Sequence, residues 1–293
     1  MPRSGERMNR NVVVSAGLVL VSSMFVTGGA ASAQGVNNAP RSGCKDLPSY
    51  DEFHTALVAA RAPSNANGGL NLDMWGTIVD RDGVVCAVVF TGQNRGDQWP
   101  GSRVISAQKA NTANAFSLPH LALSTANLYT AVQPGGSLFG LQESNPVATE
   151  VAYSGSPDRY GQPNDPMVGG RIGGINVFGG GLALYKENAN HEIFIVGGLG
   201  VSGDTSCADH NIAYRTRSTL NLDHVPAGVS GDPARRDSII FDIVPQGGGD
   251  TAPGPGQMPG VSATGFGHPS CHGYNVAGNT ASAAFAATLP PNK

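Results

Sequence analysis

The stretch from Glu192 to Arg217 most constrains how this chain can fold, because an apolar run changes there into glycines and then into a helix-like pattern. The run from Ile193 to Val196 is short and rich in β-branched and aromatic residues, which predicts a buried strand. Four glycines follow that allow positive φ or close backbone approach, namely Gly197, Gly198, Gly200 and Gly203. We therefore expect the strand to end in a tight glycine turn.

The residues after this turn predict a helix. Ser206 with Asp209 three residues later resembles a capping box, and Asp209 also places negative charge near the positive end of the helix dipole. An apolar stripe suited to packing on a sheet follows and consists of Ile212, Ala213, Thr216 and Leu220. The glycines also spell G-x-G-x-x-G, but no repeated βαβ units surround them, so the pattern indicates a strand-to-helix turn rather than a nucleotide site.

The N-terminal residues have the pattern of an export signal. Three arginines precede a mostly apolar run from Val12 to Val26, and Ala31-Ser32-Ala33 matches an A-x-A cleavage site. We assign residues 1–33 to a signal peptide and residues 34–47 to a polar leader. The sequence thus predicts an exported protein, periplasmic or extracellular, with no membrane span after signal cleavage.

The charge balance argues against nucleic acid as a partner. The whole chain carries 18 Lys and Arg against 21 Asp and Glu, for a net charge of −3. Removal of the signal deletes Arg3, Arg7, Arg10 and Glu6, which makes the net charge −5. Binding to phosphate backbones requires clustered basic residues, and the mature sequence has none. We expect a small-molecule ligand instead.

Four cysteines remain after cleavage, which in an oxidising compartment predicts two disulfides with three possible pairings. We favour Cys44 with Cys86 and Cys207 with Cys271, which would tie the first helix to a strand and the tail to the central helix. The alternative is a zinc site, because Cys207, His210, His268 and Cys271 have short ligand spacing. The disulfide is favoured over zinc because free thiols would be oxidised in that compartment.

The other elements are predicted from periodicity and turn residues. We expect helices from about Pro48 to Ala62, over Ser102 to Phe116 and, shorter, over Leu121 to Val132. Strands are expected over Leu70 to Asp80, Val84 to Thr91, Ile175 to Phe178, Leu182 to Tyr185, Glu192 to Val201 and Ser238 to Val244. Residues 150–170 are expected to form a surface loop, and the Gly- and Pro-rich residues 223–293 an extension wrapped over the domain.

Four motifs occur in a recognisable order along the chain. They are Ile78-Val79-Asp80-Arg81-Asp82-Gly83, Lys109-Ala110-Asn111-Thr112-Ala113, Gly179-Gly180-Gly181-Leu182 and Gly198-Leu199-Gly200-Val201-Ser202-Gly203. With them the chain resembles the GlcG/HbpS-like haem-binding family, also called the haem-degrading domain, over residues 48–222. The resemblance implies an α+β fold in which an antiparallel sheet of about five strands is flanked by helices. It also implies a single domain that forms homo-oligomers.

The resemblance implies haem as a ligand, and several residues suit it. Lys109 and Thr112 lie three apart on one helical face, so both can meet a haem propionate. Gly200 and Gly203 would let a flat ligand approach the backbone. His210 and His120 are the candidate axial ligands of the haem iron. The alternatives are a solvated Lys109, a Thr112 packed on the sheet, and histidines that serve only the surface or the core.

The chain departs from the family pattern in places that affect a ligand site. Gly180-Gly181-Leu182-Ala183 replaces a usual Gly-Gly-Val-Pro, and Asp209-His210 replaces Asp-Glu. No nucleophile motif or triad identifies catalytic residues. The leading hypothesis is an exported haem-binding or tetrapyrrole-binding protein that acts in haem or iron handling or in redox sensing. The alternatives are an exported enzyme that uses the same pocket on a small organic substrate, with or without a metal, and a protein whose assembly is its function.

Overall fold

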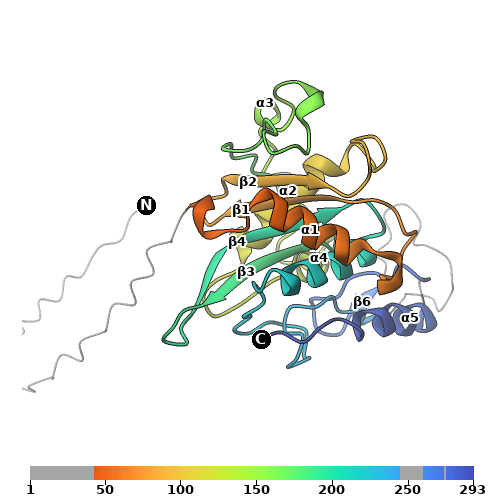
Figure 1. Cartoon of the computed structure of the whole chain (residues 1–293). Helices are drawn as coiled ribbons and strands as arrows, with labels where there is room; N and C mark the ends of the chain where they lie inside the picture. Colours follow the sequence, from red (N-terminus) through yellow and green to blue (C-terminus); the bar gives the residue numbers. More distant parts are fainter. Residues whose placement is uncertain (1–42, 245–259, 274) are drawn as a thin grey trace, which may run out of the picture. The chain divides into compact units, whose positions relative to one another are not determined.

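A four-stranded antiparallel sheet with strand order β2-β1-β4-β3 is the centre of the fold (Figure 1). The structure is a computed structural model that describes residues 43–244, 260–273 and 275–293. The strands are β1 (Trp75–Asp80), β2 (Val85–Phe90), β3 (Gly181–Glu187) and β4 (Ile193–Ser202). The expected α+β class is confirmed, with four strands in the main sheet. The predicted signal peptide, and the leader as far as residue 42, lie outside the described residues.

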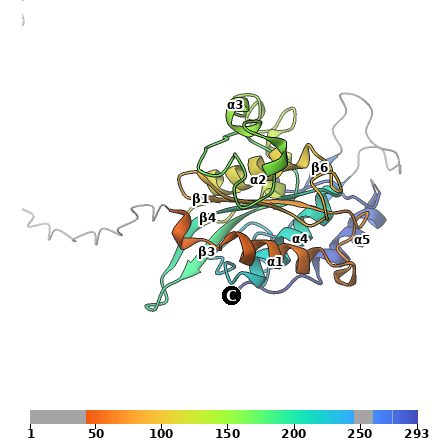
Figure 2. The same cartoon turned by 45° about the horizontal axis from the view of Figure 1, so that its top comes forward.

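Helices cover both faces of this sheet (Figures 1 and 2). They are α1 (Tyr50–Arg61), α2 (Ser102–Phe116), α3 (Thr149–Ala152), α4 (Ser206–Thr219) and α5 (Val276–Ala286). Ile78 of β1 packs in one core cluster with α1 and α4, whereas its neighbour Val79 packs with α2 in another. Alternate strand residues therefore bury opposite faces, as the period of a strand requires. Within the described residues, no helix is long and apolar enough to cross a membrane.

The first two helices lie where the sequence predicts them. The Ser49 side chain caps α1 by accepting from the Glu52 backbone N–H, while Glu52 accepts from Ser49 in return. This reciprocal pair is a capping box, which explains why the helix begins here. Helix α2 spans the predicted residues 102–116.

The glycines within β4 serve close packing, which is one of the two roles expected of them. The expected turn lies after the strand, at the bend over residues 203–204. The strand continues to Ser202, and none of Gly197, Gly198, Gly200 and Gly203 has positive φ. A Cβ on Gly200 would collide with the backbone oxygen of Ser106, and one on Gly198 with that of Ala110. The missing side chains therefore let α2 lie directly against the backbone of β4.

Two other predicted elements are wrong. Residues 175–178 form no strand, and residues 121–132 form the two 3₁₀ turns Thr125–Leu128 and Thr130–Val132 instead of an α-helix. Ile175 and Val177 pack against these turns in a small apolar cluster. The Asn176 backbone N–H donates to the Thr112 hydroxyl at 3.0 Å, so this hydrogen bond goes to a side chain rather than to a neighbouring strand.

Residues 150–170 are packed more closely than the expected surface loop. Met167 is fully buried in the cluster that holds β1 and the start of α2. Arg103 of α2 donates to Asp165 at 2.9 Å through Nε and to the Ala152 carbonyl oxygen at 2.7 Å through Nη1. Since both charged side chains are buried, this pair anchors the segment on the first turn of α2.

The C-terminal residues pack on α4 and contain structure that we did not predict. The expected strand over 238–244 is reduced to β5 (Ile243–Val244), which pairs with β6 (Val261–Ser262), and α5 was not expected. Asp237 accepts from Arg217 at 2.5 Å, with both side chains fully buried. The predicted disulfides Cys44–Cys86 and Cys207–Cys271 are confirmed, and the second joins these residues to α4.

Candidate functional site

Lys109 and Asp209 form a buried ion pair between α2 and α4. The Lys109 ammonium donates to Asp209 at 2.7 Å and to the Val201 carbonyl oxygen at 3.0 Å. The other Asp209 oxygen accepts the backbone N–H groups of Gly203 and Asp204. Burial raises the pKa of Asp209 to about 6 and lowers the pKa of Lys109, because desolvation disfavours both charges. The pair thus joins both helices to the end of β4.

Thr112 lies one turn further along α2 and is also buried. Its hydroxyl donates to the Gln108 carbonyl oxygen at 2.7 Å and accepts from the Asn176 N–H at 3.0 Å. Lys109 and Thr112 thus share a helix, as predicted, but both make internal hydrogen bonds in the single chain.

His210 follows Asp209 on the first turn of α4 and is fully buried. Its Nε2 accepts the Ile239 backbone N–H at 3.1 Å, while Nδ1 has no hydrogen-bond partner among the described residues. A nitrogen that accepts an N–H carries no proton, so the proton of the neutral ring is on Nδ1. Burial, together with the nearby Arg217 charge, lowers the pKa of His210 to about 3. His210 is therefore neutral at physiological pH, the form that binds metals.

The Gly179-Gly180 backbone brings these groups together. A Cβ on Gly180 would lie 3.1 Å from the Asp209 Cβ and 3.2 Å from the Lys109 ammonium. A Cβ on Gly179 would lie 3.0 Å from the Cβ of His210. Lys109, Asp209 and His210 thus form one cluster beside this backbone. His120 lies outside the cluster, with an exposed side chain on the turn after α2.

Sequence reasoning missed a serine–histidine pair at the start of α4. The Ser206 hydroxyl accepts from the Gly179 N–H at 2.7 Å and lies 2.8 Å from His268 Nε2. His268 Nδ1 lies 2.8 Å from the Pro269 carbonyl oxygen, which indicates that Nδ1 carries the proton and that Nε2 accepts from Ser206. The helix is capped by Thr205 instead of Ser206. The predicted Cys207–Cys271 bond was the available signal, because it brings Ser206 and His268 together.

A serine hydroxyl hydrogen-bonded to a histidine can act as a nucleophile and its general base, but the surroundings of Ser206 and His268 favour a structural role. Burial lowers the pKa of His268 to about 4, which makes it a weak base. The described cavities of the chain do not include Ser206 among their lining residues. The Ser206–His268 hydrogen bond therefore holds the C-terminal residues on α4.

The Cys207–Cys271 disulfide also argues against the alternative zinc site at Cys207, His210, His268 and Cys271. The sulfurs of Cys207 and Cys271 are bonded to each other, so neither is available as the thiolate that zinc binds. Among the described residues, potential ligand atoms gather within 4.8 Å of one another at Cys44, Asp80 and Cys86, where the two cysteines again form a disulfide.

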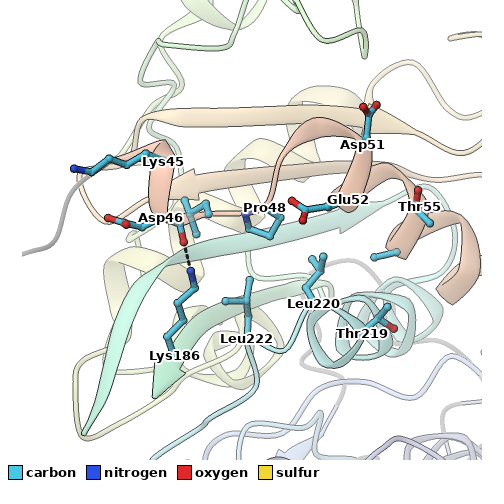
Figure 3. A pocket seen from close by; sticks show the side chains of 12 residues that line it. Lys45, Asp46, Pro48, Asp51, Glu52, Thr55, Lys186, Thr219, Leu220 and Leu222 are labelled. Atoms are coloured by element: carbon cyan, nitrogen blue, oxygen red, sulfur yellow. Dashed lines mark hydrogen bonds between the residues drawn. The ribbon is translucent and has the colours of Figure 1, made fainter. Parts of the chain in front are cut away.

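A cavity of about 670 Å³ lies between the start of α1 and the ends of β3 and α4. Figure 3 shows Lys186 reaching toward Asp46, where its ammonium donates to the backbone oxygen, with the apolar side chains of Leu220 and Leu222 nearby. None of the residues that line this cavity is His, Cys, Met or Tyr, so its walls provide no axial ligand for haem iron. The predicted site residues also lie elsewhere.

Comparison with known proteins gives one family and several solved structures. The family described as "Haem degrading protein HbpS-like" matches residues 49–217. The solved structure of the PduOC:heme complex shares 23% sequence identity with this chain; the match covers 59% of this chain and 93% of that chain, with a TM-score of 0.39. Klebsiella pneumoniae protein ORFY shares 24% identity over 58% of this chain and 87% of that chain, with a TM-score of 0.37. A double mutant of Streptomyces reticuli HbpS shares 15% identity over 69% of this chain and 98% of that chain, with a TM-score of 0.37. No curated protein matches the chain.

Proposed function

The chain belongs to the HbpS-like family of haem degrading proteins, and from this premise we propose that it is an exported protein that binds haem. The observation that carries the proposal is the extent of the match. Residues 49–217 run from the cap of α1 to the end of the buried face of α4, so they include the whole main sheet and the cluster around His210. The proposed role is haem or iron handling, or redox sensing through the bound haem.

His210 is the first candidate for the axial ligand. Its ring is neutral, and Nε2, which carries no proton, could bind iron after losing the Ile239 N–H. Because His210 is fully buried beneath Ile239, haem can reach it only if the Ile239 segment moves away from α4. His120 is the second candidate and needs no such movement, since its side chain is exposed.

The other predicted contacts keep a supporting role in this proposal. Lys109 would have to leave Asp209 to pair with a propionate, and Thr112 would have to release Asn176. Gly200 lies against the Ser106 backbone and Gly203 against Asp73, so both are covered in the single chain. A contact between haem and any of these four residues would therefore require that residue first to leave its present protein partner.

Export and assembly are further parts of the proposal. The A-x-A pattern at residues 31–33 supports export, and two disulfides are compatible with an oxidising compartment. Homo-oligomerisation follows from the family expectation. The mass of the secreted protein, and light scattering from it after gel filtration, test both points.

A haemin titration of the purified mature protein tests the main proposal. We expect a saturable, stoichiometric Soret shift that is lost in either His210→Ala or His120→Ala, which identifies the axial ligand. His191→Ala is the matched control, because this side chain is 88% exposed on the β3–β4 turn. If wild-type protein shows no saturable shift, haem binding is rejected. The alternative of an exported enzyme acting on a small organic substrate then becomes the leading hypothesis.

A further inference from the structure

A second cavity, of about 370 Å³, lies between the 150–170 segment and the first turn of α2. In both views of the molecule, α3 and its connections lie beside α2, away from α1 and α4 (Figures 1 and 2). The lining of this cavity includes Trp75, Arg95, Arg103, Val104, Tyr153 and Tyr160. The volume is within the range of about 300–1,000 Å³ that is typical of small-molecule sites.

Two tyrosines of the 150–170 segment give the cavity aromatic walls. The Tyr160 ring is held in place, because the Arg103 guanidinium lies 3.6 Å from its centroid and its hydroxyl donates to the Tyr153 carbonyl oxygen at 3.1 Å. Tyr153 itself is 61% exposed, so its ring is accessible to a ligand. Aromatic rings stack on flat ligand rings, and Val104 and Pro157 add apolar contact.

Trp75 contributes an unused hydrogen-bond donor. The residue is 1% exposed, and its ring packs edge-on against Phe90 with 5.3 Å between centroids. Its indole Nε1 has no hydrogen-bond partner among the described residues. A buried donor without an acceptor costs about 1–3 kcal/mol. A ligand oxygen that accepted from this N–H would recover that free energy.

Arg95 provides a positive charge that is held only by a weak, exposed ion pair. Its guanidinium lies 3.4 Å from Asp158, and the two side chains are 49% and 83% exposed. An exposed ion pair of this kind contributes only about 0–1 kcal/mol, so the arginine can exchange Asp158 for a ligand anion. The first turn of α2 has no side-chain cap at Gly101, and its dipole adds positive potential on the same side.

We propose that this cavity binds a planar aromatic carboxylate of one or two rings. The ring lies between the tyrosines and the apolar wall. One carboxylate oxygen pairs with Arg95, and the other accepts from the indole of Trp75. The site is separate from the proposed haem site, because none of the residues that line it belongs to the His210 cluster.

Calorimetric titration with 1-naphthoate tests the proposal, with the uncharged isostere 1-naphthamide as the ligand control. We expect naphthoate to bind and the amide to bind about tenfold more weakly. Arg95→Gln and Tyr153→Ala should each weaken naphthoate binding about tenfold, whereas Asp158→Asn should strengthen it about threefold by freeing Arg95. Arg159→Gln and Phe139→Ala are matched controls on exposed residues outside the cavity and should leave the affinity unchanged.

The indole N–H signal of Trp75 gives a second, site-specific measurement. The chain contains two tryptophans, so Trp99→Phe assigns the two indole signals in a ¹⁵N spectrum. Naphthoate should shift the Trp75 signal downfield, as expected for a new hydrogen bond. The proposal is overturned if the amide binds equally well, if the Arg95 and Tyr153 variants bind like wild type, or if the Trp75 signal does not move. Competition by stoichiometric haemin would also overturn it, because the cavity would then be the haem site.

Discussion

The Lys109 ammonium lies 2.7 Å from the Asp209 carboxylate in the protein interior, where neither side chain is more than 3% exposed. This pair connects the centre of α2 to the first turn of α4, immediately before His210. Lys109 was expected to meet a haem propionate, whereas in the single chain it neutralises a buried carboxylate. The following variants separate structural from ligand-binding roles in this region.

Lys109→Met should lower the free energy of unfolding by about 3–5 kcal/mol, because it leaves Asp209 charged and buried without a partner. Urea denaturation monitored by circular dichroism measures the change. The double variant Lys109→Met, Asp209→Asn should recover part of the loss, since it removes the orphaned charge. Unchanged stability combined with lost haemin affinity would contradict the structural role and return Lys109 to the ligand site.

Gly200→Ala should destabilise the protein by about 1–3 kcal/mol, since the added Cβ meets the backbone oxygen of Ser106 and α2 has to move away from β4. Gly96→Ala is the control, because Gly96 lacks positive φ and its added Cβ would have no atom within 4 Å. The two melting temperatures are compared with wild type. Equal melting temperatures for both variants would show that α2 and β4 do not require this close approach.

His210→Gln should flatten the dependence of stability on pH. The pKa of His210 is about 3 in the folded protein and about 6.5 when unfolded, so the unfolded state binds the proton first as pH falls. The stability contributed by neutral His210 is thus complete above pH ~6.5 and decreases toward pH ~3. Glutamine keeps an acceptor for the Ile239 N–H but does not titrate.

Melting temperatures of both proteins between about pH 7 and 4.5 measure this effect. Wild type should lose more stability than His210→Gln over the range. The raised pKa of Asp209 acts in the opposite direction but is common to both proteins, so their difference isolates His210. Parallel profiles would show that His210 becomes protonated without cost in the folded state.

Replacement of Cys207 and Cys271 by serine should increase haemin affinity about fivefold to tenfold. The disulfide and the Ser206–His268 hydrogen bond hold the C-terminal residues on α4, and Ile239 of the same part of the chain covers His210. Loosening this cover increases the fraction of molecules in which His210 is accessible, and apparent affinity rises with that fraction.

The double serine variant of Cys44 and Cys86 is the control for this experiment. Each change should cost about 2–5 kcal/mol of stability, so both variants are titrated well below their melting temperatures. An equal effect of the two variants on haemin affinity would contradict the idea that the C-terminal residues cover the site.

Much of the fold could be predicted because its signals are local. Periodicity placed α1 and α2, and the count of cysteines in a chain expected to be exported led to two disulfides. The motifs around Lys109 and Gly200 supported the family resemblance, which the match over residues 49–217 confirms. Prediction was weaker where the pattern was ambiguous. Residues 175–178 are apolar like a strand, but they pack against 3₁₀ turns instead of a neighbouring strand.

The candidate site was predicted less completely. Sequence reasoning selected Lys109, Thr112 and His210, and the structure places Lys109 and His210 on either side of Asp209 in a buried cluster. It missed the hydrogen bond between Ser206 and His268, and it did not foresee that residues 223–293 provide Asp237 and Ile239 as partners for α4. Composition identified this part of the chain only as rich in glycine and proline.

The positions of α1 and α2 and the presence of two disulfides could be predicted from the sequence, because helix signals are local and four cysteines allow only three pairings. The fold class followed from the family resemblance. The partners of the buried polar groups became apparent only in the tertiary structure. Lys109 and Asp209 are 100 positions apart in the sequence, and Arg103 and Asp165 are 62 apart. Such pairs form because the chain buries both charges at one place, and burial makes an unpaired charge too costly. No local pattern contains that information.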